Sequence, residues 1–259
     1  MYRRFKLDVS RNIWQDYFYL GQDINNQNLS LFRRDLNEFI SKGHTLSANH
    51  IMDNWFPKIN ADIFLSHSHK DKVIVYSFAG FLYKKFGLRS FIDSSVWGYA
   101  DELLRTLDDR YCLKNNGCYS YEKRNRSTSH VHMMLSSSLA KMMDKCECLI
   151  FINTPNSFIP SENIDNTGST GSPWIYSELV MSELLRVNVP DRLKKVVASM
   201  DSYDFSENMK ISYQVDISHL YNLNKDILNN WRLDYLSDKK RNPLDILYSI
   251  TQDRGVIYG

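Results

Sequence analysis

The chain has 259 residues, of which 43% are apolar and 24% are charged, and its formal net charge at pH 7 is +2. This composition is that of a folded globular protein, long enough for one large domain or for one domain with an extension. The near-neutral charge gives no reason to expect nucleic-acid binding by the protein as a whole.

The cysteines and the apolar runs indicate a cytoplasmic protein. The four cysteines, two of them in the CEC stretch at 146–148, lack the CxxC spacing of redox and zinc sites and suggest a reduced compartment. No apolar run approaches the length of a membrane span, and the basic N-terminal stretch has no apolar core of a secretory signal. We therefore expect no membrane partner.

Residues 1–58 are predicted to form an N-terminal helical extension. Apolar residues recur at helical spacing over 28–43, and Gly43 is a natural stop for that helix. A second short helix is expected over 47–57, where Pro57 would end it. This segment carries no evident site chemistry, so packing is its expected role.

From residue 59 to residue 259, short apolar runs alternate with amphipathic stretches. Strands are predicted at 61–66, 89–93, 148–153, 194–199 and 210–218. Helices are predicted at 73–87, 130–146, 173–186 and 223–236. This alternation predicts an α/β domain with a parallel five-stranded sheet flanked by helices, the last of which completes the C-terminal end.

Ligands of such sheets bind beyond the carboxyl ends of the strands. That rule selects three segments that follow predicted strands, namely 66–72, 93–104 and 153–173. The third segment is long, polar and glycine-containing, which is typical of a functional loop.

The helix that follows this loop carries a carboxylate beside its apolar face. Ser172 is a good N-cap, and Pro173 suits the first helical position. At about 100° per residue, Glu178 falls beside Trp174, whereas Glu183 points to the solvated side. Glu178 is therefore either a residue at the edge of this face that reaches water or a lysine, or a functional carboxylate.

Other signatures of catalysis or metal binding are missing from the sequence. It has no GxGxxG, Walker or GxSxG motif. His67 and His69, like His130 and His132, lack further ligands at a credible spacing, so we expect no metal. A serine nucleophile after the first strand has no oxyanion signature to support it.

A single carboxylate suits one glycosidic reaction better than others. Most glycoside hydrolysis needs two carboxyl groups. The nicotinamide of NAD is a cationic leaving group that departs without protonation, so one fixed carboxylate can stabilise the positive charge that develops on the ribose. A nearby tryptophan or histidine could stack on nicotinamide or adenine. A single carboxylate could therefore suffice for cleavage of NAD, a reaction in which NAD is the substrate and no further cofactor is expected.

Four stretches, in this order and spacing, resemble the bacterial form of the TIR (Toll/interleukin receptor) domain family. They are DIFLSHSHKD (62–71), GLRSFIDSSVW (87–97), CLIFINTPNSF (148–158) and SPWIYSEL (172–179), the last of which carries the family's W-x-x-x-E pattern. The resemblance covers roughly residues 60–225 and implies a flavodoxin-like fold.

The resemblance also implies roles for individual residues. In TIR enzymes the glutamate of this pattern is essential for NAD cleavage, which places the catalytic role on Glu178. Substrate contacts come from the loop after the first strand and from the BB loop after the second strand. In this sequence the implied substrate-binding residues are Ser66, His67, His69, Ser95, Trp97, Tyr99 and Trp174.

The 1–58 extension and an insertion at about 99–129 depart from the family's minimal pattern. They make the chain similar to the TIR proteins of Thoeris-type antiphage defence, which turn NAD into an ADP-ribose-derived signal for a separate effector protein. The resemblance further implies a homo-oligomer that forms through the BB loop at 94–99.

The expected function is therefore NAD cleavage, with release of nicotinamide and an ADP-ribose-derived product. The alternative is a TIR protein–protein interaction module without catalysis. A nucleoside-processing hydrolase or transferase on a related sheet is a more distant possibility.

Overall fold

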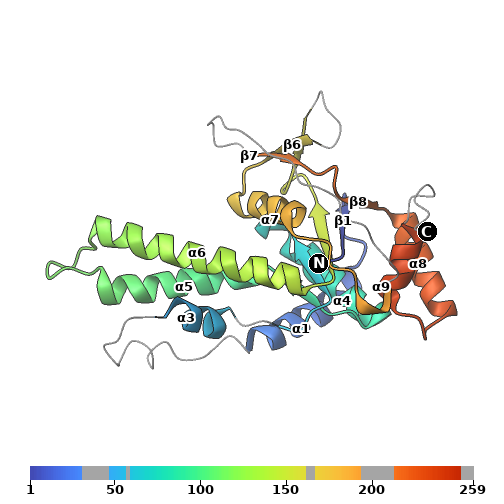
Figure 1. Cartoon of the computed structure of the whole chain (residues 1–259), viewed down its shortest axis with the longest axis horizontal. Coiled ribbons are helices and arrows are strands. Elements are labelled where there is room, and N and C mark those ends of the chain that lie inside the picture. Colours follow the sequence, from blue (N-terminus) through green and yellow to red (C-terminus); the bar gives the residue numbers. More distant parts are fainter. Residues whose placement is uncertain (31–46, 57–58, 162–166, 194–212, 252–259) are drawn as a thin grey trace.

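A computed structural model of the chain describes residues 1–30, 47–56, 59–161, 167–193 and 213–251 (Figure 1). Within these ranges, five parallel strands form the main sheet in the order β3-β2-β4-β1-β8. The strands are β1 (Arg3–Asp8), β2 (Ile63–Ser66), β3 (Ser90–Ile92), β4 (Cys148–Asn153) and β8 (Tyr221–Leu223). The predicted α/β class is confirmed, and a five-stranded parallel sheet flanked by helices is compatible with a flavodoxin-like fold.

Helices cover both faces of this sheet, which is why its strands are apolar on both sides. In β2, Ile63 and Leu65 point into one core and Phe64 into the other. The first core is closed by α4 (Lys72–Phe86), α8 (Lys225–Ser237) and α9 (Pro243–Ile250). The second is closed by α3 (Ala48–Trp55), α5 (Ser94–Tyr111), α6 (Tyr121–Lys145) and α7 (Pro173–Leu184). None of the helices in the described ranges has both the length and the apolar character that crossing a membrane requires.

The N-terminal segment differs from the predicted helical extension, because its first residues belong to the sheet. β1 pairs in parallel with β4 on one side and with β8 on the other. Phe5 and Leu7 are buried in the core, and Arg3 is buried as well. Arg3 Nη1 donates to the Tyr248 carbonyl of α9 and to Thr251 Oγ1, each at 3.1 Å, which ties the buried guanidinium to the C-terminal helix. After a non-helical stretch at 9–14, the described part of the segment contains the short helix η1 (Gln15–Tyr17), α1 (Phe18–Ser30) and α3.

Two of the five predicted strands are not among the described strands of the main sheet. The strand predicted at 194–199 lies outside the described residues. The strand predicted at 210–218 exists as β7 (Tyr213–Asp216), but it pairs in a separate antiparallel sheet with β5 (Ile159–Pro160) and β6 (Thr167–Thr170). The remaining positions in the main sheet are therefore filled by β1 and β8.

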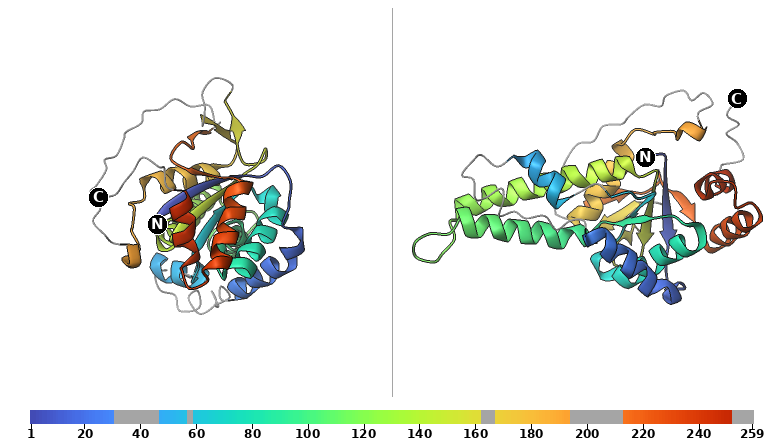
Figure 2. Two further views of the ribbon diagram at one scale, coloured as in Figure 1. Left: turned by 90° about the vertical axis from the view of Figure 1, so that its right-hand side faces the viewer. Right: turned by 90° about the horizontal axis from the view of Figure 1, so that it is seen from below.

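The predicted insertion at about 99–129 is the outer part of a long helical hairpin. Figures 1 and 2 show α5 and α6 side by side, extending away from the sheet. A buried carboxylate, Asp108, joins the two helices, because it accepts hydrogen bonds from Arg124 Nε at 2.9 Å and from Ser127 Oγ. The helix predicted over 130–146 thus begins earlier, at Tyr121.

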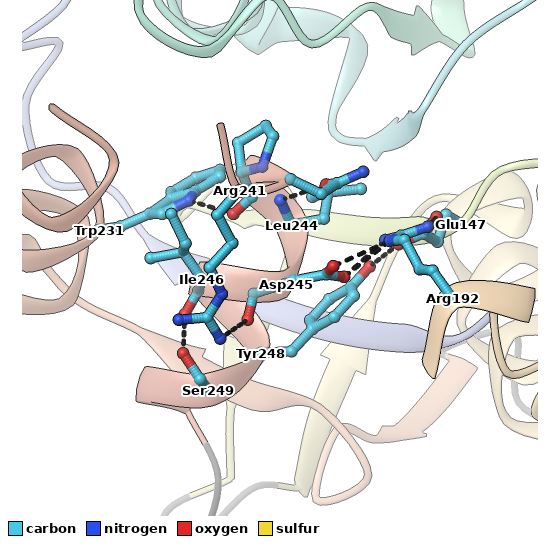
Figure 3. Close-up of polar contacts among 11 residues, drawn as sticks. Glu147, Arg192, Trp231, Arg241, Leu244, Asp245, Ile246, Tyr248 and Ser249 are labelled. Atoms are coloured by element: carbon cyan, nitrogen blue, oxygen red, sulfur yellow. Dashed lines mark hydrogen bonds and ion pairs between the residues drawn. The ribbon is translucent and has the colours of Figure 1, made fainter. Parts of the chain in front are cut away.

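A polar cluster joins helix α9 to the end of the sheet at which its strands begin (Figure 3). Arg192, in the short helix η3 (Asp191–Leu193), lies between Glu147 and Asp245. Its Nη1 donates to Glu147 Oε2 and its Nε to Asp245 Oδ1, each at 2.8 Å. Tyr248 Oη also donates to Glu147, at 2.9 Å. Because Glu147 immediately precedes β4, this cluster holds α9 against the amino ends of the strands.

Candidate active site

The candidate site lies at the carboxyl ends of β2 and β4, which are neighbours in the sheet. From β2 the chain continues to β3 on one side, whereas β4 lies on the other side. Ligands of parallel sheets bind at such a switch point. Ser66, the last residue of β2, is fully buried there.

Helix α7 directs Glu178 toward the carboxyl ends of these strands. The helix begins as predicted: the N-cap Ser172 accepts a hydrogen bond from the Ile175 N–H at 3.3 Å, and Pro173 is the first helical residue. Glu178 is only 1% exposed, and Ser66 Oγ donates to its Oε2 at 2.6 Å. Glu178 therefore reaches neither water nor a lysine, because its carboxyl group faces the sheet.

A second carboxyl group meets Glu178 in this buried space. Asp93 directly follows β3, at the start of α5, and is completely buried. The carboxyl groups of Asp93 and Glu178 lie so close together that each affects the pKa of the other. Since two buried carboxylates repel each other, this arrangement favours a state in which one of them holds a proton.

Burial determines the charge of this Asp93–Glu178 pair. It raises the pKa of Asp93 to about 7. Burial, and next the charge of Asp93, raises the pKa of Glu178 well above its ordinary value. Two like charges in contact away from water cannot both form at neutral pH, so the pair carries at most one negative charge there.

The pair leaves an acceptor atom unused. Glu178 Oε1 accepts no hydrogen bond from a donor in the described part of the chain, whereas the backbone N–H groups of Asp93 and Ser94 face the Asp93 carboxyl group and lower its pKa. His67 Nδ1 lies 2.7 Å from Asp93 Oδ1, but its hydrogen-bond geometry favours the Leu65 carbonyl at 3.3 Å. Buried acceptors without donors are uncommon in folded proteins and mark positions where a ligand's hydroxyl groups can bind.

His67 packs behind the pair as a neutral side chain. Its Nε2 lies 2.9 Å from Ser94 Oγ, and burial lowers the pKa of the imidazole to about 4. The ring is therefore uncharged at neutral pH and does not supply a cation for the carboxyl pair. Its contacts with Ser94 and Leu65 hold the end of β2 against the start of α5.

Three of the predicted substrate contacts lie elsewhere. His69 is exposed in the turn that follows β2. Ser95 Oγ donates to Asn25 Oδ1 of α1 at 3.0 Å, and Tyr99 packs, half-buried, against the core. The side chain of Trp97 lies outside the described part of the structure.

The predicted BB loop is not a loop in this chain. Residues 94–99 form the first turns of α5, and Val96 is only 2% exposed. β3 passes into the helix through Asp93 alone, because the helix begins at Ser94. Part of the segment that was expected to mediate a homo-oligomer is therefore on the buried face of helix α5.

The predicted contact Trp174 lines a pocket that does not include the two carboxyl residues. The pocket has a volume of about 360 Å³ and lies between α5, α6 and the start of α7. Its lining residues are Ala100, Asp101, Leu104, His132, Leu135, Ser136, Pro173, Trp174 and Ser177. The structure thus brings together Ser66, His67 and Glu178, and places Trp174 one helical turn away from Glu178.

Two aspartates at the carboxyl ends of the strands were not predicted from the sequence. Asp93 stood at the end of a predicted strand, so the rule about strand ends selected its position but not its partner. Asp71, in the turn after β2, is also buried and fixes the exit of β4. It accepts hydrogen bonds from Thr154 Oγ1 at 2.6 Å and from Asn156 Nδ2 at 2.8 Å.

Within the described ranges, no group of three or more histidine, cysteine, aspartate or glutamate side chains is arranged to hold a metal ion.

Comparisons of the chain with protein-family models, with curated proteins and with solved structures find no match.

Proposed function

We propose that this protein cleaves the bond between nicotinamide and ribose in NAD, as the TIR enzymes that its sequence resembles do. The observation that carries the proposal is the buried Asp93–Glu178 pair beside Ser66, at the carboxyl ends of β2 and β4. When the pair is ionised, it supplies one negative charge at a buried position. Fixed charges in such a site stabilise a charged transition state far better than they would in water.

The reaction follows from the chemistry of the leaving group. The bond between ribose C1′ and the nicotinamide nitrogen breaks, and its electron pair neutralises the pyridinium. Positive charge develops on C1′ and the ring oxygen, where the negative charge of the pair stabilises it. Glu178 Oε1, which has no donor, would accept a hydrogen bond from a ribose hydroxyl group.

Capture of the ribosyl cation completes the reaction. Water adds to C1′, and its proton passes to the carboxyl pair and then to solvent, which gives ADP-ribose. Capture by an adenine nitrogen or by another nucleophile would give a cyclic or conjugated ADP-ribose product, the class that can act as a signal for a separate effector protein. Nicotinamide is released in each case.

One observation favours a second candidate, the interaction module without catalysis. Glu178 is buried, and it is not among the residues that line the neighbouring pocket. A carboxyl pair that never meets a substrate would be a structural feature that holds α5 and α7 together.

Incubation with NAD, followed by chromatography of the products, separates the two candidates. We expect the wild-type protein and Glu178→Gln to fold alike, and only the wild type to release nicotinamide. Glu183→Gln is the matched control, because Glu183 lies on the same helix and is exposed. Equal loss in both variants, or no nicotinamide from the wild type, would favour the interaction module.

A further inference from the structure

The pocket beside the carboxyl pair is built largely by the helical hairpin. α5 contributes Asp101, α6 contributes His132 and Ser136, and α7 contributes Trp174 and Ser177. Its volume of about 360 Å³ falls within the range of small-molecule sites. Apolar side chains from the same helices complete its walls.

Two aromatic rings form a corner in this pocket. The rings of His132 and Trp174 have centroids 5.6 Å apart and are nearly perpendicular, at 84°. A third planar ring can stack on one member of such a corner while its edge meets the other. The corner therefore suits a flat heteroaromatic group better than an aliphatic one.

The polar groups of the pocket select among flat rings. Asp101 supplies a carboxylate at the rim, and the hydroxyl groups of Ser136 and Ser177 can donate or accept. A carboxylate only accepts hydrogen bonds, and its charge attracts a cation. The chemistry complementary to these walls is a planar ring with an amino or carboxamide N–H, or with a positive charge.

The pocket and the carboxyl pair are built by neighbouring residues of the chain. Ser177, which lines the pocket, directly precedes Glu178. Trp174 precedes Glu178 by four residues, about 6 Å along the axis of α7. On α5, Asp101 follows Asp93 by about two turns. Asp93 directly precedes α5, and Glu178 lies in α7, so two of the three helices that line the pocket also position the carboxyl pair, and a ligand of the size of a dinucleotide can reach both.

We propose that this pocket binds the heteroaromatic ring of a nucleotide, with Trp174 and His132 as its aromatic walls and Asp101 as the acceptor of the ring's amino or amide hydrogen. The proposal rests on the NAD-cleaving function, which it deepens by making the hairpin residues Asp101 and His132 determinants of specificity. Both ends of NAD carry such a ring. The cationic nicotinamide ring and the adenine ring are the two sources of this chemistry.

Calorimetric titration of the Glu178→Gln protein tests the proposal without turnover. The probes are nicotinamide mononucleotide, AMP and ribose 5-phosphate, which share a phosphorylated ribose and differ in the ring. We expect one of the two ring-bearing probes to bind at least tenfold more tightly than ribose 5-phosphate. Asp101→Asn or Trp174→Ala, added to Glu178→Gln, should remove about tenfold of that affinity, whereas Glu102→Gln, at the exposed neighbouring position, should not.

The two ring-bearing probes identify the source. Preference for nicotinamide mononucleotide, with a large effect of Asp101→Asn, assigns the pocket to the cationic end of NAD. Preference for AMP assigns it to the adenine end. Equal affinity of all three probes, or affinities that Asp101→Asn and Trp174→Ala leave unchanged, would overturn the proposal. Ring binding without nicotinamide release by the wild type would instead count against the NAD-cleaving function alone.

Discussion

The sequence places the carboxyl group of Glu178 beside a tryptophan, on a helix face that is expected to be buried, and the structure explains this position. Its side chain does not line the Trp174 pocket but accepts a hydrogen bond from Ser66 and lies close to Asp93. Burial of an ionised carboxylate is costly, but a proton on one member of the pair removes one of the two charges. The residue is tolerated there because it is partnered, and the arrangement is that of a functional site more than of a packing core.

Replacement of Ser66 tests how its hydrogen bond affects the pKa of Glu178. Its hydrogen bond lowers the pKa of Glu178, against the larger upward effect of burial. Ser66→Ala should therefore raise the pKa further, move the acid limb of the pH–rate profile for nicotinamide release to higher pH, and lower the rate at neutral pH about tenfold. Loss of one buried hydrogen bond should also cost about 1–3 kcal/mol of stability.

Ser95→Ala is the control for this variant. Ser95 also makes a side-chain hydrogen bond, but its partner is Asn25 of α1. We expect a change in melting temperature without a shift of the pH–rate profile. A shift of similar size in both variants would show that the profile reports global stability and not the Ser66–Glu178 contact.

At the scale of elements, the packing of α1 on α4 depends on two glycines. A Cβ added to Gly21 would lie 1.8 Å from the Tyr76 carbonyl oxygen, and one added to Gly80 would lie 2.1 Å from that of Tyr17. Both obstacles are backbone atoms, so the helices would have to move apart. This close approach fixes α1 beside the sheet domain.

Gly21→Ala and Gly80→Ala should each destabilise the fold by about 1–3 kcal/mol, the usual effect of overpacking. Gly98→Ala is the matched control, since Gly98 lies within α5 with open space around it. There alanine should be neutral or stabilising by up to about 1 kcal/mol, because it favours the helix. Chemical denaturation of the three variants measures these differences, and equal destabilisation in all three would contradict the packing argument.

Periodicity predicted most of the elements, and it failed where distant partners decide the structure. The segment RRFKLD reads as charged, yet it forms β1, because α9 and the ring of Tyr221 accommodate Arg3 from the far end of the chain. Asp93 was missed for the same reason, since only the fold brings it to Glu178. The resemblance predicted a loop at 94–99, whereas these residues continue helically into α5.

At the scale of the whole molecule, the buried groups make stability depend on pH. The raised pKa of Asp93, about 7, means that the folded state binds its proton more tightly than the unfolded state does. The free energy of unfolding should therefore fall as pH rises from about 4 to about 7. The lowered pKa of His67, about 4, acts in the opposite direction between about pH 4 and 6.5.

Asp93→Asn separates these two effects. It removes one raised pKa and lowers that of Glu178, so its advantage in stability over the wild type should grow by about 1 kcal/mol or more between pH 5 and pH 8. Denaturation curves across this range provide the measurement. Asp53→Asn, at an exposed position, should follow the wild type. A constant difference between Asp93→Asn and the wild type would mean that Asp93 does not hold a proton in the fold.

The central claim is that Asp93 and Glu178 act as one unit in nicotinamide release, and a double-mutant cycle on kcat/KM for NAD tests it most directly. Glu178→Gln should lower kcat/KM at least about 100-fold, and Asp93→Asn combined with it should cause little further loss, because groups that act together are not additive. Losses that multiply in the double variant, full activity in Glu178→Gln, or a wild type that releases no nicotinamide would contradict the claim.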